Sequence, residues 1–208
     1  MAIGQSLAEF IASSGQCDSL IGNAHKVDHT GVHFLSQLDR EQVTVAAFLN
    51  LFISWEQFLE AAIIDFMMGD PTLNGQQPVK YVNPTSRDQS GQMVVHINKY
   101  FDFANHEYVK KLAKLYFDGG YPFDGPLNSI LVDLVDLKTI RNACAHLSST
   151  TRTALQSLAT RIFGQPHPGI SVYGLLTAID PRVPGGATTV YAAYRDKLLT
   201  AAHLISQG

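Results

Sequence analysis

Residues 39–68 read DREQVTVAAFLNLFISWEQFLEAAIIDFMM, and this stretch decides the fold class. Its apolar residues recur at helical spacing and form one wide stripe, which is typical of a helix at the centre of a core. Asp39 followed by Gln42 resembles a capping box, and Gly69 supplies a helix end. The stretch therefore predicts a long helix that runs from Asp39 to about Met68.

The same helical spacing continues over most of the chain. Further helices are predicted at about 18–38, around Val94, Ile97 and Phe101, around Tyr108, Leu112 and Leu115, at about 127–146, from 148–151 to Phe163, and at about 188–205. Residues 69–86 and most of 164–187 are rich in Gly and Pro and are predicted as loops, with Ile170–Tyr173 as a short candidate strand. We expect an all-α helical bundle, a single domain over residues 1–208 with its core at about 18–206.

The composition excludes several classes of protein. Of the 208 residues, 46% are apolar and 16% are charged, which suits a sizeable core and is too little charge for a disordered chain. The formal net charge of −3 argues against a surface coated with basic residues, so any contact with nucleic acid must be local. Cys17 and Cys144 do not make a disulfide framework, and Cys144 is expected to be a buried thiol.

The sequence also carries hints about location. The N-terminal residues, MAIGQS, lack the positive start of a signal peptide. The longest apolar stretch, Val43–Ile53, contains Thr44 and Asn50 and is too short to span a bilayer. We therefore expect a cytoplasmic protein with no membrane partner.

One short motif carries most of the chemistry that the sequence offers. Arg141-Asn142-Ala143-Cys144-Ala145-His146 ends an apolar helical segment. An arginine holds a phosphate through a bidentate fork, and a histidine transfers a proton near neutral pH. Together these groups suffice for metal-free cleavage of RNA. Arg141, Asn142 and His146 are therefore the candidate catalytic residues.

The position of Arg141 on its helix is informative. At about 100° per residue, Arg141 falls on the apolar stripe between Leu134 and Leu137. A guanidinium there needs a carboxylate, a phosphate or another subunit as its partner. Glu56, at the edge of the stripe in residues 39–68, and Glu60, one turn further on, are candidates to hold the arginine fork, or else belong to a solvated acidic edge. The spacing equally suits a helix C-terminus with a favourable histidine and a structural salt bridge from Arg141.

Two further clusters are candidate binding sites. One helix carries three lysines on its outer side, Lys110, Lys111 and Lys114. They are candidates for guiding an RNA backbone, although a solvated helix face has the same pattern. His25, His29 and His33 are spaced four apart and would form a ridge on a helix that suits a metal. No cysteine or second acidic motif supports such a site, so we expect no metal and no cofactor.

Two segments resemble prokaryotic HEPN-domain proteins. Ser54-Trp55-Glu56-Gln57-Phe58-Leu59-Glu60, followed by a helix end at Met68-Gly69, is similar to the early helix of that family. Residues 141–146 match its R-x4–6-H motif, including the polar residue after the arginine. The two signatures are about 85 residues apart. With the order of elements over residues 18–206, they resemble the RiboL-PSP-like branch of predicted ribonucleases.

The resemblance implies a helical bundle that forms a homodimer, in which two R-x4-H motifs meet in one metal-independent RNA-cleaving site. Arg141 and His146 take the motif positions, and Asn142 takes the polar position. It also implies a toxin or defence role, with an antitoxin protein as a candidate partner. The loop at 69–86 and the tail after residue 164 are less typical of the minimal domain and leave the path of the RNA open.

We therefore expect an endoribonuclease that cleaves RNA by attack of the ribose 2′-OH at a composite dimer site. The alternative is a non-catalytic helical binding module, partnered with a nucleotidyltransferase-type antitoxin. A third hypothesis is a metal protein built on His25, His29 and His33. Cleavage of RNA in the presence of EDTA distinguishes the first hypothesis from the second.

Overall fold

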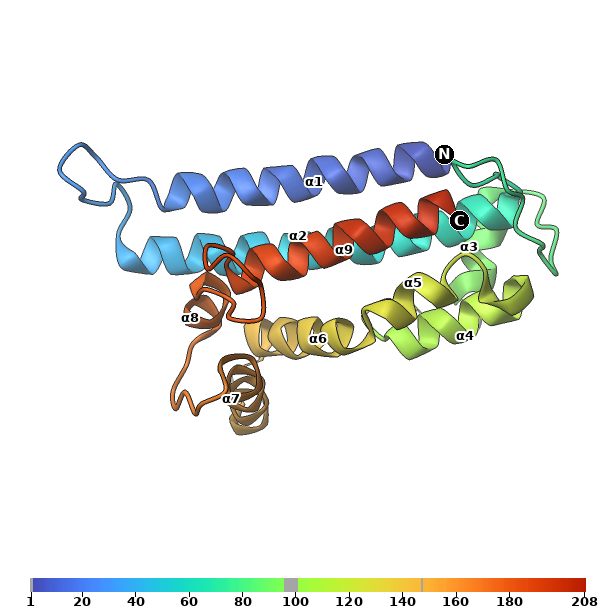
Figure 1. Cartoon of the computed structure of the whole chain (residues 1–208). Coiled ribbons are helices and arrows are strands. Elements are labelled where there is room, and N and C mark those ends of the chain that lie inside the picture. Colours follow the sequence, from blue (N-terminus) through green and yellow to red (C-terminus); the bar gives the residue numbers. More distant parts are fainter. Residues whose placement is uncertain (1, 96–100, 147) are drawn as a thin grey trace. The chain divides into compact units, whose positions relative to one another are not determined.

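The computed structural model describes residues 2–95, 101–146 and 148–208. Helices cover 68% of the chain and the described residues contain no strand, which confirms the predicted all-α class. In chain order (Figure 1) the helices are α1 (Ile3–Ala24), α2 (Gln37–Met68), α3 (Arg87–Val95), α4 (His106–Tyr116), the 3-10 helix η1 (Asp118–Gly120), α5 (Asp124–Ser129), α6 (Leu131–Ala145), α7 (Ser149–Phe163), α8 (Val172–Thr177) and α9 (Val190–Gln207).

The helices assemble into two compact units. The first unit comprises Met1–Ile11, Ser54–Leu134 and Leu198–Gly208, and the second comprises Ala12–Ile53 and Val135–Lys197. Helices α1, α2, α6 and α9 each contribute residues to both units. The single domain over residues 1–208 stays a prediction.

Aromatic rings form much of the core of the first unit. The ring of Phe10 lies 5.8 Å from that of Trp55 and 5.6 Å from that of Phe58. Phe66 meets Phe117 and Phe123 edge-on, at 6.4 Å and 5.8 Å between ring centroids. Helices α4 and α5 pack beside each other in this unit (Figure 1). These rings explain why the stripe in the C-terminal half of α2 is so wide, because large side chains reach it from several segments.

A buried carboxylate connects three helices of the first unit. The side chain of Asp65, on α2, is fully buried. It accepts a hydrogen bond of 2.7 Å from the Ser6 hydroxyl of α1 and one of 2.6 Å from the Arg87 guanidinium of α3. Burial raises the pKa of Asp65, and the two hydrogen bonds oppose that rise.

Helix α2 matches the prediction closely. It begins at Gln37 because Ser36 caps it: the Ser36 hydroxyl accepts a bond of 3.2 Å from the Asp39 N–H and donates one of 2.6 Å to the Asp39 carboxylate. The cap is therefore Ser36, three residues before the predicted start at Asp39. Gly69, with φ of 95°, follows the end of the helix as predicted.

Helix α2 is also long and apolar enough to cross a membrane, judged by length and composition alone. Half of its most apolar 18-residue window is buried inside the protein. A buried core helix passes the same test, so this observation does not place the protein in a membrane.

The bounds of the helix predicted at about 18–38 are wrong, because the helix that contains residue 18 starts earlier and ends at Ala24. Helix α1 runs from Ile3 to Ala24, and Ile3, Leu7, Phe10 and Cys17 are buried along one face. Their spacing of four, three and seven residues is helical, but Gly15 and Gly22 weaken the local preference for a helix. The core therefore begins at Ile3 and not at about residue 18.

Residues 25–36 leave the helix because Asp28 organises a tight turn. Its Oδ1 accepts bonds from the Thr30 N–H at 2.8 Å, the Thr30 hydroxyl at 2.6 Å and the Val32 N–H at 3.0 Å. Gly31 adopts a φ of 83°, which favours glycine. The hydroxyl of Thr30 and the neighbouring amides lower the pKa of Asp28, because they stabilise its charged form.

Other boundaries differ in smaller ways. The helix predicted at about 127–146 is two helices, α5 and α6, which meet at Ile130. The candidate strand Ile170–Tyr173 is wrong: Ser171 caps α8, and the short helix begins at Val172. For the helix predicted around Val94, the structure has α3 from Arg87 to Val95, while Ile97 lies outside the described residues. The predicted restart at 148–151 is confirmed as α7, whose N-cap is Ser148.

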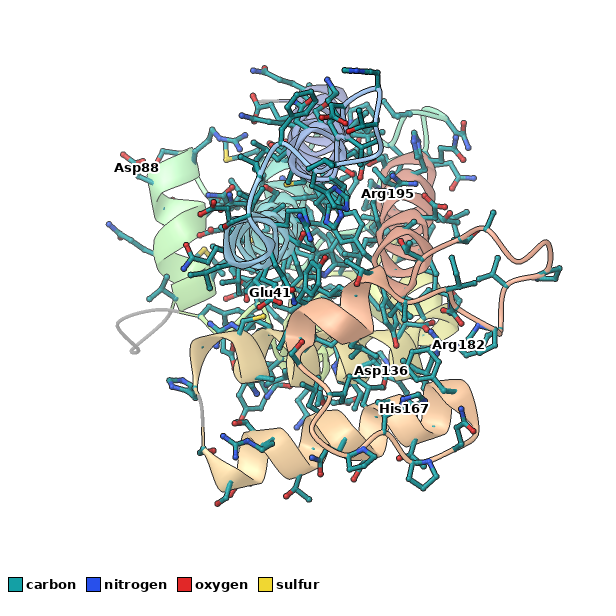
Figure 2. All side chains as sticks on the ribbon, turned by 90° about the vertical axis from the view of Figure 1, so that its left-hand side faces the viewer. Glu41, Asp88, Asp136, His167, Arg182 and Arg195 are labelled. Atoms are coloured by element: carbon teal, nitrogen blue, oxygen red, sulfur yellow. The ribbon has the colours of Figure 1, made fainter. Side chains whose placement is uncertain are left out.

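A second buried carboxylate, Asp136, organises the second unit. It lies on α6, is 3% exposed, and accepts a 2.8 Å hydrogen bond from the Tyr194 hydroxyl of α9. The Arg161 guanidinium of α7 forms an ion pair with it. Arg182, drawn near Asp136 in Figure 2, lies 4.0 Å from it and binds buried Asp180 through two guanidinium nitrogens. These side chains, called the Asp136 network below, join α6, α7, α9 and the loop before α9.

We predict that Asp136→Ala lowers the free energy of unfolding by roughly 2–3 kcal/mol, because it leaves a buried tyrosine hydroxyl and a guanidinium without their acceptor. Urea unfolding followed by circular dichroism measures this value. Asp196→Ala is the matched control, since Asp196 is largely exposed and pairs with Arg195 at the surface. It should cost less than about 1 kcal/mol. Equal losses in the two variants would contradict a structural role for the Asp136 network.

Candidate functional site

The three predicted catalytic residues gather at the end of α6. Arg141 and Asn142 lie in its last turn, and His146 follows the last helical residue. The His146 N–H donates to the Asn142 carbonyl at 2.9 Å, so the backbone keeps its helical course as far as the histidine. The side chain of His146 is exposed, whereas Arg141 and Asn142 are half-buried. The imidazole of His146 is therefore open to solvent.

The guanidinium of Arg141 is held by its neighbour. Its Nη1 donates to the Asn142 side-chain oxygen at 3.3 Å. Within the described ranges no ion pair of Arg141 is found, whereas Arg87, Arg161 and Arg182 each bind a carboxylate. The structural salt bridge considered for Arg141 is therefore not formed there. A guanidinium has five N–H donors, and among the described side chains only Asn142 accepts from that of Arg141.

The backbone of His146 is fixed from the other side by α7. The Thr151 hydroxyl donates to the His146 carbonyl at 2.5 Å, while the Ser148 hydroxyl accepts from the Thr151 N–H at 3.2 Å. Ser148 and Thr151 thus form the capping box that starts α7. Sequence reasoning found the cap of α7 but missed the bond to His146. The start of a capped helix within five residues of the motif was the signal that it offered.

The exposed face of α6 in the second unit leads to the histidine. Val135, Thr139 and Asn142 are spaced four and three apart, so they lie along one side of the helix. Val135 is 48% exposed, whereas Leu137 on the opposite side is fully buried. The apolar stripe of Leu134 and Leu137 is covered by the protein's own core and is not available to a partner. The face of α6 that carries Val135, Thr139 and Asn142 is the part of this helix that a partner could contact.

A cavity of about 680 Å³ lies beside the motif in the second unit. Its walls come from residues 38–49 of α2, from the motif's own Ala143 and Cys144, from the start of α7 and from residues 169–173. Most of the lining is apolar, but Glu41, Gln42 and Arg152 contribute polar groups. Neither Arg141 nor His146 lines it. Within the motif, Ala143 and Cys144 therefore face the cavity, whereas His146 faces solvent.

Cys144 is a neutral thiol on the wall of this cavity. It is half-buried, and burial raises its pKa to about 12, although the nearby charge of Arg141 acts in the opposite direction. A thiol with such a pKa carries almost no thiolate at neutral pH. Cys144 therefore serves as an apolar surface and not as a nucleophile.

The remaining predicted site residues belong to the first unit. Glu56 lies on α2 and is half-buried. Its pairing with Arg141, which belongs to the second unit, stays a prediction. Among the three lysines of α4, Lys110 lies 3.5 Å from Glu107, Lys114 lies 2.9 Å from Asp124, and Lys111 lies over the ring of Tyr108. Two of these cations are thus already paired with carboxylates, and a role of the three in RNA binding stays a prediction.

The predicted histidine ridge is wrong, because residues 25–36 are not helical. His25 and His33 lie 6.3 Å apart between ring centroids, and the His25 Nε2 lies 3.2 Å from the Thr44 hydroxyl. In the part of the chain that the structure describes, no group of three or more His, Cys, Asp or Glu side chains is arranged to hold a metal ion. His25 instead stacks on Tyr173, with the rings 5.8 Å apart and inclined by 8°.

Comparisons of the chain with protein-family models, with curated proteins and with solved structures find no significant match. The resemblance to HEPN-domain proteins therefore rests on the residues themselves. Those are the early helix signature at 54–60 and the motif at 141–146. Both lie on helices, α2 and the end of α6, within an all-α protein.

Proposed function

We propose that the protein is a metal-independent endoribonuclease whose reaction centre is built from Arg141, Asn142 and His146. One observation carries the proposal. The Arg141 guanidinium, positioned by Asn142 and without an ion pair in the described ranges, lies five residues before an exposed histidine. A guanidinium with vacant donors binds a phosphate well, and an exposed imidazole exchanges protons near neutral pH.

The chemistry that these groups support is transesterification of RNA. The ribose 2′-oxygen forms a bond to the adjacent phosphorus while the bond from phosphorus to the 5′-oxygen breaks. One His146 imidazole accepts the proton of the 2′-OH, and a second, protonated imidazole donates a proton to the leaving 5′-oxygen. Arg141 stabilises the negative charge that grows on the phosphoryl oxygens. The products are a 2′,3′-cyclic phosphate and a 5′-OH.

This scheme needs two histidines, and each chain supplies one motif. A homodimer of C2 symmetry brings the two motifs together, since an isologous contact places the same surface of each copy face to face. The exposed face of α6 suits that contact, because Val135 lies on it and Asn142 and His146 follow along the same side. A toxin or defence role, in the cytoplasm, accords with such an activity.

A second candidate function is a non-catalytic module that binds an antitoxin of the nucleotidyltransferase type. The observation that favours it is a set of exposed apolar side chains in the loop between α1 and α2 and in the first turn of α2. Val32 is 62% exposed, Phe34 70% and Leu38 62%. Exposed apolar side chains that gather in one segment often mark a surface for another protein.

We predict that His146→Ala lowers the rate of RNA cleavage by roughly 100-fold or more, because general acid–base catalysis contributes about that much. Cleavage of a fluorogenic RNA oligonucleotide measures the rate. His203→Ala, which removes another exposed histidine from a helix, should cleave at the wild-type rate. Arg141→Lys should also lose most activity, since a lysine keeps the charge but not the fork. Full activity in His146→Ala would exclude His146 as the proton-transferring group.

Cleavage is expected to continue in EDTA. The proposed steps use only an imidazole and a guanidinium, so chelation should leave both the rate and the 2′,3′-cyclic phosphate product unchanged. Product ends are identified by mass spectrometry after digestion with and without chelator. Activity that stops in EDTA and returns with one divalent ion would refute the metal-independent scheme.

The dimer is tested by a charge placed on the exposed face of α6. Val135→Glu should yield a monomer with little activity, because two buried carboxylates would face each other across the twofold axis. Val79→Glu is the matched control, since Val79 is 63% exposed and lies in the loop after α2. Sedimentation velocity gives the mass and circular dichroism checks the fold. A wild-type monomer that is fully active at nanomolar concentration would rule out a composite site.

A further inference from the structure

The cavity beside the motif has the composition of a site for a small planar ligand. Its volume, about 680 Å³, lies within the range of ligand pockets, which are mostly apolar with a few polar groups. Val45 and Leu49 of α2, Leu155 of α7 and Ile170 supply apolar walls. Such walls suit the faces of a ring system.

The polar groups of the cavity come from two helices. Glu41 and Gln42 lie on α2, and Arg152 lies on α7. In Figure 2, Glu41 lies on the side of α2 that faces α8. One of its carboxylate oxygens accepts a 2.9 Å bond from the Gln37 amide, which leaves the other oxygen for a ligand. A purely apolar ligand would displace water from the Glu41 carboxylate and the Arg152 guanidinium without replacing the lost hydrogen bonds, so a ligand with polar groups fits the cavity better.

Tyr173 gives the cavity a braced aromatic wall. It lines the cavity, and the ring of His25 is stacked nearly parallel on it. The Thr44 hydroxyl lies 3.2 Å from the His25 ring nitrogen and so fixes the orientation of the stack. Burial lowers the pKa of His25, and the charges of Arg40 and His33 act in the same direction. The tyrosine is therefore backed by a neutral imidazole at pH 7.

The cavity and the motif share their walls. Ala143 and Cys144, which line the cavity, lie between Arg141 and His146 in the sequence. Thr151 also lines it and donates the 2.5 Å hydrogen bond to the His146 carbonyl. A ligand in the cavity therefore lies against the same turn of backbone that carries the proposed reaction centre.

We propose that this cavity holds one unpaired nucleobase of the RNA next to the cleaved bond, and that the preferred base is guanine. The inference rests on the proposed ribonuclease function and adds its base specificity. A carboxylate only accepts hydrogen bonds, and guanine presents two adjacent N–H donors, N1–H and N2–H₂, on its Watson–Crick edge. Glu41 accepts from that edge, the apolar walls and Tyr173 contact its faces, and Arg152 binds the attached phosphate.

Binding of mononucleotides to the full-length protein tests the proposal without requiring cleavage. Guanosine monophosphate should bind at least about tenfold more tightly than the adenosine, cytidine and uridine monophosphates, by titration calorimetry. Glu41→Gln, which keeps the size of the side chain, should weaken guanosine monophosphate by about tenfold or more. Glu9→Gln, an exposed glutamate of α1, should have no effect. Equal affinity of the four nucleotides would overturn the guanine assignment.

A second variant fills the cavity from its edge. Ala46 lines the cavity but is exposed on α2, so Ala46→Trp should block the base without disturbing the core. Ala154→Trp, at an exposed position of α7 outside the cavity, is the matched control. Unchanged thermal unfolding in both variants shows that they fold. Wild-type binding of guanosine monophosphate by Ala46→Trp would overturn the assignment of the cavity.

Cleavage of an RNA with a single guanine separates this inference from the proposed function. The wild-type protein should cut beside the guanine, and Glu41→Gln should cut all positions more evenly. His146→Ala should bind guanosine monophosphate like the wild type while losing cleavage. Binding without any cleavage would retain the base site and refute the ribonuclease. Cleavage without nucleotide binding, and without preference for guanine, would refute the base site alone.

Discussion

The buried carboxylate of Asp136 is the interaction on which the position of the motif depends. It lies five residues before Arg141 on α6 and binds side chains from α7 and α9. A buried charge is costly unless its partners keep their positions, so the helices around it have little freedom to shift. The network therefore fixes the first half of α6 against the last turn of α7, and the motif follows on the same helix α6. Thr151, at the start of α7, in turn holds the carbonyl of His146.

The buried residues that hold helix α6 in place and the residues of the proposed reaction centre lie in different parts of the helix. Leu137 and Ile140 are fully buried, and they hold the helix by burial of apolar surface. Arg141 begins a last turn in which polar groups bind each other, and His146 then leaves the helix. A proton-transferring group needs access to water and substrate, whereas its backbone needs a fixed position. The exposed imidazole on an anchored carbonyl meets both requirements.

The sequence predicted those parts of the protein whose signals are local. The sequence predicted the wide apolar stripe of α2, its end before Gly69 and the capping residues before α7. Each of these signals depends only on residues that are close in the sequence. The first part of helix α1 was not predicted, because glycines and serines interrupt its apolar stripe. The stripe can be recognised only when the residues that bury it are known. The histidine ridge failed for the opposite reason: spacing of four suggested a helix, and the side chain of Asp28 bound the backbone of its own turn instead. The Asp136 network was beyond prediction, because its members are up to 58 residues apart.

The candidate site shows the same division. Arg141, Asn142 and His146 lie within six residues of each other, so their proximity at a helix end followed from the sequence. The absence of an ion pair of Arg141 in the described ranges did not. That absence matters energetically. Arg182, which binds Asp180 through two nitrogens, has its donors directed at a fixed anion, and a substrate phosphate would have to displace a carboxylate. Among the residues that the structure describes, Arg141 is held only by a neutral amide at 3.3 Å, a weaker bond that a phosphate replaces at small cost. Of these two arginines, Arg141 is therefore the better candidate to bind a phosphate of another molecule.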